Sequence, residues 1–400
     1  MNTHDAPRMQ SLTLNSASFI AQFGLSMIGL ALVYHLRAAF GLSPQMVGIS
    51  VSIPTFSYFV FCIVLGPVCT RFKPRHCVEI SAIGMTLSVI AILYSTQVWQ
   101  VYIALACYGL FMSFLWPQIM AWLSRGKEEK ELGRATGSFN FSWSLGAAIS
   151  PLVTGFLVER STELPLFVAI GFLLAVFALI LMATMLQPSI RAAKSEQQNT
   201  SEETRKDHST PLRFLCWAGV LTVYASLAVL QTIFPMYAQD TLMYSESRVG
   251  ILLLARGFAT CLAFVYMRNS TWWHFKRSGA ILMQACAALS YFALSRLNGQ
   301  SAFGLYLFVF LCFGIFFSAV YSMSIFHGVS GSVNRSKRML VHEILLTTGT
   351  IAGSSLGGTV YEYFGFSNVA LWCTVLVAVP VVISIVRTYA FRSARTKYGH

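Results

Sequence analysis

The sequence predicts an all-α, polytopic membrane protein whose twelve transmembrane helices form two pseudo-symmetric bundles of six. Three observations support this fold class: the composition, the number of long apolar segments, and an internal repeat. Of the 400 residues, 56% are hydrophobic and 11% are charged. An average soluble domain carries about 25% charged residues, so this chain cannot cover the surface of a water-soluble globular protein. Its high hydrophobicity also excludes an intrinsically disordered chain.

The apolar residues gather in twelve segments. A helix needs about 20 apolar residues to cross the hydrocarbon core of a bilayer, and only helices or closed barrels satisfy their backbone hydrogen bonds there. These segments are continuous rather than alternating, which favours helices. The predicted spans are residues 13–36, 45–69, 77–97, 99–123, 135–158, 164–186, 213–238, 248–267, 279–295, 302–326, 340–362 and 367–387.

The basic residues predict how the chain is threaded through the membrane. Lys and Arg are enriched in the cytoplasmic loops of membrane proteins. With the N-terminus in the cytoplasm, most of the 28 basic residues fall in cytoplasmic segments, and the outer loops hold Arg37, Arg160, Arg248 and Arg296. This asymmetry accounts for the net charge of +13 without a nucleic-acid partner. We therefore expect an integral protein of a bacterial inner membrane with both termini in the cytoplasm.

Motifs of enzymes and metal sites are absent from the sequence. The nine cysteines are scattered in or beside apolar segments, with no CxxC pair and no Cys/His cluster, so no metal or other cofactor is expected. No HExxH, P-loop or Rossmann glycine motif occurs. We therefore expect no enzymatic activity, and an ion gradient or a solute gradient as the energy source.

One hydrophilic segment divides the chain. Residues 188–212 carry charges of both signs and few apolar residues, which is typical of a flexible cytoplasmic linker. They separate an N-terminal six-helix bundle, residues 1–187, from a C-terminal bundle with a short cytoplasmic tail, residues 213–400.

The two halves share a sequence repeat. Three residues recur at an offset of 202, namely Ser43, Val47 and Gly48 as Ser245, Val249 and Gly250. Three more recur at an offset of 203, namely Gly146, Gly155 and Glu159 as Gly349, Gly358 and Glu362. A shared offset on equivalent helices indicates two related halves, and two such halves around a cleft are expected of an alternating-access transporter.

A degenerate motif lies in the loop between the second and third predicted spans. The loop contains Gly66, Thr70, Arg71, Lys73 and Arg75. Its glycine, first arginine and last basic residue match the pattern Gly-x-x-x-Asp-Arg-x-Gly-Arg-Arg, whereas Thr70 replaces the acid and Lys73 the second glycine. Together with the 6+6 layout, the repeat and the linker, this motif makes the whole chain resemble the major facilitator superfamily. The resemblance implies alternating access, with Gly66, Arg71 and Arg75 in a cytoplasmic latch between conformations.

The fifth predicted span carries a second motif of that family. Gly137, Gly146, Pro151 and Gly155 match the exporter-associated pattern Gly-x8-Gly-x3-Gly-Pro-x2-Gly-Gly, and small residues replace two of its glycines. The resemblance implies an exporter. Small residues also let helices approach closely in any membrane protein, so helix packing alone is an equally good interpretation of this motif.

Two charged side chains fall within predicted spans, where an ionisable group is expensive and usually functional. Arg256 lies about eight residues from the outer end of its span, and we interpret it as a cation that binds a polar or anionic substrate group; a structural bond to helix carbonyls is the alternative. Glu343, beside His342 near the inner end of its span, is the candidate for proton coupling or gating. It is also well placed to pair with Arg71 or Arg75 in the latch, or to interact with the helix dipole.

The repeat extends to polar positions that resemble cavity-lining residues of the family. Asn140 corresponds to Glu343, and Gln118 corresponds to Tyr321, at the offset of 203. The expected substrate-binding residues are Trp116, Gln118, Asn140, Trp143, Gln231, Arg256 and Tyr321, with Gln22 and Tyr34 as weaker candidates. Aromatic and amide groups suit an organic solute with apolar faces and few polar groups.

These residues support three hypotheses about function. The first is a secondary transporter, acting as a monomer among membrane lipids, that exports a small organic solute in exchange for protons. The second is an uptake permease or uniporter for a sugar-like or organic-anion nutrient. The third is a sensor or scaffold with a transporter fold that moves no solute.

Overall fold

The computed structural model describes residues 6–69, 71–124, 129–186, 208–332 and 334–398. In these residues the secondary structure is helical throughout. The first half contains α1 (Ala6–Phe40), α2 (Pro44–Cys69), α3 (Pro74–Leu93), α4 (Val98–Met112), α5 (Trp116–Ser124), α6 (Glu129–Val158) and α7 (Leu164–Leu186). The second half contains α8 (Leu212–Asp240), α9 (Glu246–Asn269), α10 (Arg277–Arg296), α11 (Phe303–Val329), α12 (Arg335–Phe364) and α13 (Phe366–Tyr398). Most of the predicted linker, and Thr70 of the loop motif, lie outside the described residues.

Eleven segments of the described chain are helices long and apolar enough to cross a membrane. The predicted span that is not among them, residues 340–362, corresponds to α12, a helix of 30 residues that is less apolar than the others and packs against α2 and α8 inside the bundle. The predicted fold class, twelve transmembrane helices in two bundles, is therefore confirmed.

The fourth span is broken, which the sequence analysis did not predict. Residues 113–115 form a turn between α4 and α5. Pro117 explains the break because proline has no amide hydrogen and its ring clashes with the carbonyl group four residues earlier, here that of Ser113. The N–H group of Ser113 still donates to the carbonyls of Gly109 and Leu110, so α4 closes normally before the break.

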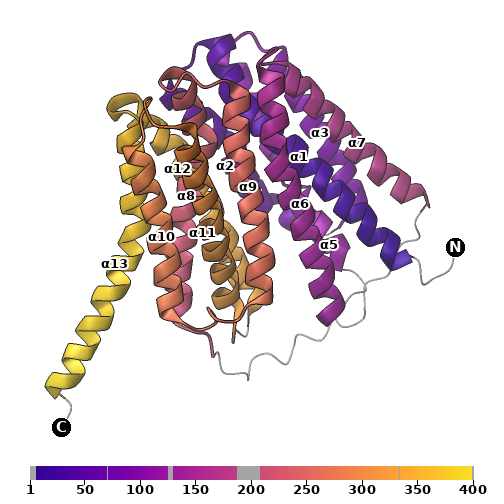
Figure 1. Ribbon diagram of the computed structural model, residues 1–400. Coiled ribbons are helices and arrows are strands. Elements are labelled where there is room, and N and C mark those ends of the chain that lie inside the picture. Colours follow the sequence, from indigo (N-terminus) through magenta and orange to yellow (C-terminus); the bar gives the residue numbers. More distant parts are fainter. Residues whose placement is uncertain (1–5, 70, 125–128, 187–207, 333, 399–400) are drawn as a thin grey trace.

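The two halves pack side by side, with both chain termini at the same end of the molecule (Figure 1). We call this end the terminal end and the opposite one the distal end. Within the halves, α1 packs against α6 and α7, and α8 packs against α11, α12 and α13. Between the halves, α6 packs against α9 and α2 packs against α12, so each half contributes one helix to each contact.

Two pairs of repeated glycines, Gly48 with Gly250 and Gly155 with Gly358, lie at the contacts between the halves. A Cβ atom at Gly358 of α12 would lie 2.6 Å from the carbonyl oxygen of Pro44 in α2, and one at Gly155 of α6 would collide with the carbonyl oxygen of Glu246 in α9. Pro44 and Glu246 are themselves separated by the repeat offset of 202. The sequence repeat therefore reflects equivalent helix contacts, α6 with α9 and α12 with α2. Glycine is needed at these positions because the two helix backbones are in contact.

Substituting alanine at Gly155 or Gly358 is expected to lower the thermal unfolding temperature of the purified protein by several degrees. The added methyl group overlaps backbone atoms, and overpacking of this kind costs about 1–3 kcal/mol. Gly171→Ala is the matched control, because no atom lies within 4 Å of a Cβ built there. Equal unfolding temperatures for all three variants would contradict the role assigned to these contacts.

Candidate functional site

The largely buried helices α1 and α8 each keep a few side chains accessible on one face. On α8, Tyr224 and Leu227 are partly exposed and Gln231 is exposed. These positions recur at helical spacing and therefore share one face. On α1, Gln22 and Ser26 are partly exposed on one face, and Gln22 Nε2 donates to Ser26 Oγ at 3.0 Å. Because both helices lie inside the bundle, these faces border the space between its helices.

An aromatic cluster lies beside this face of α8. It consists of Tyr224 from α8, Phe317 and Tyr321 from α11, and His342 from α12. Ring centroids are 5.2 Å apart for Tyr224 and Phe317, 6.1 Å for Tyr224 and Tyr321, and 5.3 Å for Tyr321 and His342. His342 is buried, with Nδ1 hydrogen-bonded to Ser324 Oγ at 3.0 Å. Two predicted residues, Tyr321 and His342, are therefore in contact, and Tyr224 is a neighbour that sequence reasoning missed.

Glu343 lies where the two halves face each other. The residue is exposed, and it lies close enough to Tyr58 and Cys62 of α2 and to Tyr321 of the aromatic cluster for its charge to act on them. A carboxylate in this position lies near side chains of both halves. Tyr58 and Cys62 carry no motif, so nothing in the sequence pointed to them.

The predicted latch residues lie at the terminal end of the first half. Arg75 Nη1 donates to the carbonyl oxygen of Thr184 at 3.2 Å, and its guanidinium lies 5.3 Å from the centre of the Trp122 ring. Arg71 is exposed. No atom lies within 4 Å of a Cβ built at Gly66. Arg75 thus ties α3 to α7.

Arg256 is buried inside the second half rather than between the halves. Only 5% of the residue is exposed, and its Nε has no hydrogen-bond partner in the described part of the chain. Its charge interacts with Tyr224 and Tyr291. In the same part of the chain, no carboxylate forms a salt bridge with it. Arg256 is therefore a buried cation without a compensating anion, and the aromatic cluster is its neighbour through Tyr224.

The predicted aromatic and amide residues of the first half lie within that half, and three of them make contacts there. The rings of Trp116 and Phe139 meet edge to face at 6.2 Å. Trp143 Nε1 donates to Asn140 Oδ1 at 3.2 Å. Gln118 is buried, with 8% of its surface exposed.

The glycine motif of α6 contributes to helix packing. Gly146 faces α1, where a Cβ would lie 2.6 Å from the carbonyl oxygen of Phe19. Pro151 faces Gly250 of α9, and the nearest atom to a Cβ at Gly137 is Arg268 Nη1 at 3.4 Å. Close helix packing therefore explains Gly146 and Gly155 without reference to the direction of transport.

Polar contacts join the two halves at the distal end. Arg37 forms a salt bridge with Asp240 at 2.9 Å, Glu159 Oε1 accepts from the Ser247 amide at 3.0 Å, and Glu362 Oε2 accepts from the Gln45 amide at 2.8 Å. We call the four side chains Arg37, Asp240, Glu159 and Glu362 the distal clamp. Each glutamate binds the N-terminal turn of a helix in the opposite half, where the helix dipole favours an anion.

The distal clamp follows the repeat symmetry. Glu159 and Glu362 are separated by 203 residues, as are Arg37 and Asp240. Hydrogen bonds from Ser247 lower the pKa of Glu159 below its ordinary value. Sequence reasoning assigned Arg37 to topology alone and used Glu159 only as a marker of the repeat. Arg37 and Asp240 carry opposite charges at the ends of equivalent helices, 203 residues apart. This spacing was the signal in the sequence that could have identified the distal clamp.

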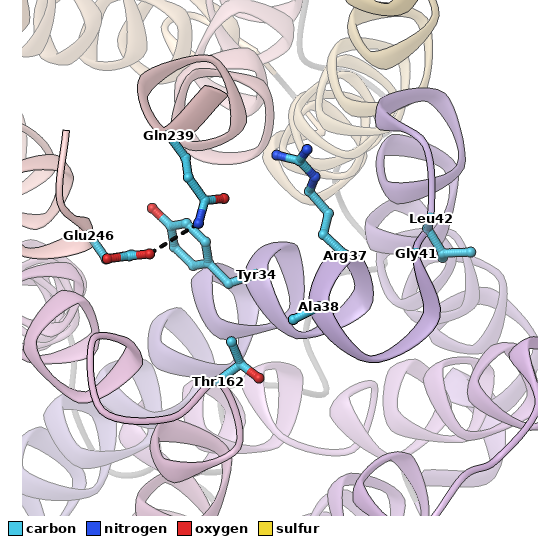
Figure 2. Close-up of a pocket in the computed structure, with 8 residues that line it drawn as sticks. All are labelled: Tyr34, Arg37, Ala38, Gly41, Leu42, Thr162, Gln239 and Glu246. Atoms are coloured by element: carbon cyan, nitrogen blue, oxygen red, sulfur yellow. Dashed lines mark hydrogen bonds between the residues drawn. The ribbon is translucent and has the colours of Figure 1, made fainter. Parts of the chain in front are cut away.

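A pocket of about 290 Å³ opens beside the distal clamp. Figure 2 shows Tyr34 and Arg37 on α1, Thr162 on the loop after α6, Gln239 on α8 and Glu246 on α9 around it. Its remaining lining residues are Ala38, Gly41 and Leu42. The pocket therefore has walls from both halves.

Comparison with known proteins agrees with this architecture. The chain is 22% identical to Multidrug resistance protein 1 of Bacillus subtilis (strain 168) over 235 residues, which is 59% of this chain and 60% of that protein. The chain thus spans less than two thirds of that curated relative. A bacterial homologue of the human lysosomal transporter Spinster, solved in an inward-facing, unoccupied conformation, superposes with a TM-score of 0.77 at 11% identity, covering 95% of this chain and 96% of that one.

A second group of solved structures has the same fold. A POT family transporter in complex with a thioalcohol-conjugated peptide superposes with a TM-score of 0.76 at 12% identity, covering 95% of this chain and 96% of that one. The family model of the Major Facilitator Superfamily matches residues 14–331. That match covers most of the chain and agrees with the two-bundle fold, so this protein is a membrane transporter rather than an enzyme and belongs to the major facilitator superfamily.

Proposed function

We propose that the protein exports a small organic solute in exchange for protons. The observation that carries this proposal is the position of Glu343: an exposed carboxylate within the bundle that interacts with α2 of one half and with the aromatic cluster of the other. A carboxyl group that gains or loses a proton there changes the charge between the halves, which biases their arrangement. The multidrug-resistance relative supports export as the direction.

The distribution of basic residues orients the molecule. We infer that the terminal end faces the cytoplasm of a bacterial cell and the distal end faces outward. The distal clamp closes the outer side, so this arrangement of helices corresponds to an inward-facing state. When the halves rock against each other, the sites for the solute and the proton become accessible from the opposite side of the membrane.

Arg256, from its buried position beside the aromatic cluster, influences the charge preference of the substrate site. A buried cation with no carboxylate partner favours an anionic or strongly polar group on the solute. Tyr224 lies within electrostatic range of Arg256, Tyr321 and Glu343. It therefore links the residue proposed to attract the solute, Arg256, with the residue proposed to carry the proton, Glu343. The aromatic cluster provides flat apolar surface for the remainder of the solute.

Flux into proteoliposomes tests this function. The panel should contain radiolabelled salicylate as an aromatic anion, ethidium as an aromatic cation and glucose as a neutral solute, each with and without a pH gradient. Transport of the aromatic anion that requires the gradient is expected. Downhill flux that ignores the gradient would indicate a uniporter and contradict proton coupling, and rates equal to those of empty liposomes would contradict transport.

Arg256→Ala is expected to raise the KM for the anionic solute at least tenfold, because it removes the buried charge. Arg256→Lys keeps the charge and should give an intermediate KM. Arg248→Ala is the matched control, since Arg248 is an exposed residue of the same helix, with its guanidinium 5.7 Å from the centre of the Tyr244 ring. If Arg256→Lys has the wild-type thermal stability and both Arg256 variants keep the wild-type KM, Arg256 does not contribute to solute binding.

A further inference from the structure

The distal pocket contains a polar group with no partner. Tyr34 is 3% exposed, and its hydroxyl forms no hydrogen bond within the described residues. In Figure 2 the Tyr34 ring lies between Arg37 and Glu246, with its hydroxyl directed towards Gln239 and Glu246. A buried hydroxyl group without a hydrogen bond destabilises a protein, so a ligand that hydrogen-bonds to Tyr34 in this pocket would be stabilising.

Hydrogen-bond acceptors dominate the Glu246 side of the pocket. Gln239 Nε2 donates to Glu246 Oε1 at 3.1 Å, which leaves Glu246 Oε2 and Gln239 Oε1 as acceptors. The Tyr34 hydroxyl is a third acceptor. A ligand that satisfies this side must supply several N–H or O–H donors.

The unbalanced charge of the pocket is negative. Arg37 is already paired with Asp240 at 2.9 Å, whereas the partner of the Glu246 side chain among the described side chains is the neutral amide of Gln239. Glu246 is the first residue of α9, and acidic residues are preferred in the first turn of a helix. The face of the Tyr34 ring adds a second preference for cations.

We propose that the distal pocket binds a small protonated amine. The ammonium group donates to Glu246 Oε2, to Gln239 Oε1 and to the Tyr34 hydroxyl, and a short carbon chain fits the volume of about 290 Å³. This site is separate from the space that holds Glu343 and the aromatic cluster. Its existence does not depend on the proposed export function.

Binding at this pocket would hold the distal end closed. Tyr34 belongs to the first half, whereas Gln239 and Glu246 belong to the second. A ligand that bonds to both halves stabilises the arrangement in which they meet. An amine in the outer solution is therefore an inhibitor of cycling that acts without entering the central site.

Isothermal titration calorimetry of the purified protein with ethylammonium tests the site. Wild-type protein should bind ethylammonium, and tetramethylammonium, which has no N–H donor, should bind at least tenfold more weakly. Glu246→Gln should weaken ethylammonium binding at least tenfold and Tyr34→Phe at least threefold. Binding of acetate in preference to ethylammonium, or no heat with either ion, would overturn the proposal.

Matched controls separate a lost site from lost folding. Tyr237 is the repeat equivalent of Tyr34 and stacks on Phe366 at 4.2 Å, outside the pocket, so Tyr237→Phe should leave ethylammonium binding unchanged. Glu163→Gln removes an exposed acid that does not line the pocket and should also leave it unchanged. If Glu246→Gln keeps the wild-type unfolding temperature and the wild-type affinity for ethylammonium, the assignment is wrong even if the protein exports solutes as proposed.

Discussion

Replacing Glu343 by glutamine is expected to abolish the effect of a pH gradient on transport. Glutamine has nearly the size of glutamate but cannot exchange a proton, so the group between the halves would keep one charge state at every pH. We expect gradient-driven flux to fall at least tenfold, while flux in the absence of a gradient falls much less. Proteoliposome flux at matched protein density measures both rates.

Glu79→Gln is the control for this substitution. Glu79 lies near the terminal end of α3, where it accepts a hydrogen bond from Thr184 at 2.8 Å and pairs with His76 at 3.1 Å, within one half. It should keep the gradient dependence of the wild type. A Glu343→Gln protein that still responds fully to the gradient would exclude Glu343 as the proton carrier and leave it a gating role.

Replacing both Glu159 and Glu362 by glutamine is expected to open the distal end. Each glutamate stabilises the closed arrangement by binding the N-terminal turn of a helix in the opposite half. At exposed sites such an anion contributes about 0.3–1 kcal/mol, so the double substitution should shift the equilibrium towards the open distal end by roughly three- to thirtyfold.

Distances across the distal end measure this shift. Spin labels at Ser161 and Met243, which are exposed residues on opposite halves, report the separation in a background without the nine native cysteines. The double variant should populate a longer distance. Glu163→Gln, an exposed acid of the same loop, should not, and unchanged distances in the double variant would contradict the distal clamp.

The distal clamp should also respond to acid. Because the pKa of Glu159 is lowered by its bonds to Ser247, the ionised form favours the closed arrangement. This contribution is fully present above the ordinary carboxyl pKa of 4.5 and is lost as the pH falls through the lowered pKa. The label distance in the wild type should therefore lengthen only in strong acid, and this acid response should be smaller in the double variant.

The sequence predicted the fold because membrane insertion depends on local composition. An apolar segment of sufficient length is a span whatever its neighbours are, and the repeat at 202 and 203 residues located equivalent contacts such as Gly155 and Gly358. The break after Met112 was missed even though Pro117 was visible in the sequence. A proline inside a span can bend a helix or interrupt it, and the sequence alone did not distinguish the two.

The arrangement of the polar side chains was less accessible to sequence reasoning. Glu343 was singled out from its position in a span, but Tyr58 and Cys62 lie near it only because α2 packs against α12. Arg256 was also singled out, whereas its burial beside Tyr291 depends on how α11 packs against both α9 and α10. Such contacts join residues that are distant in the chain, and no single segment encodes them.

The proton movement driven by a solute gradient tests proton-coupled export most directly. Wild-type protein in lightly buffered proteoliposomes should move protons in the direction opposite to a transported solute when only the solute gradient is imposed, and the pH change should be absent with Glu343→Gln. Solute movement without any pH change, or with protons moving in the same direction as the solute, would contradict proton-coupled export.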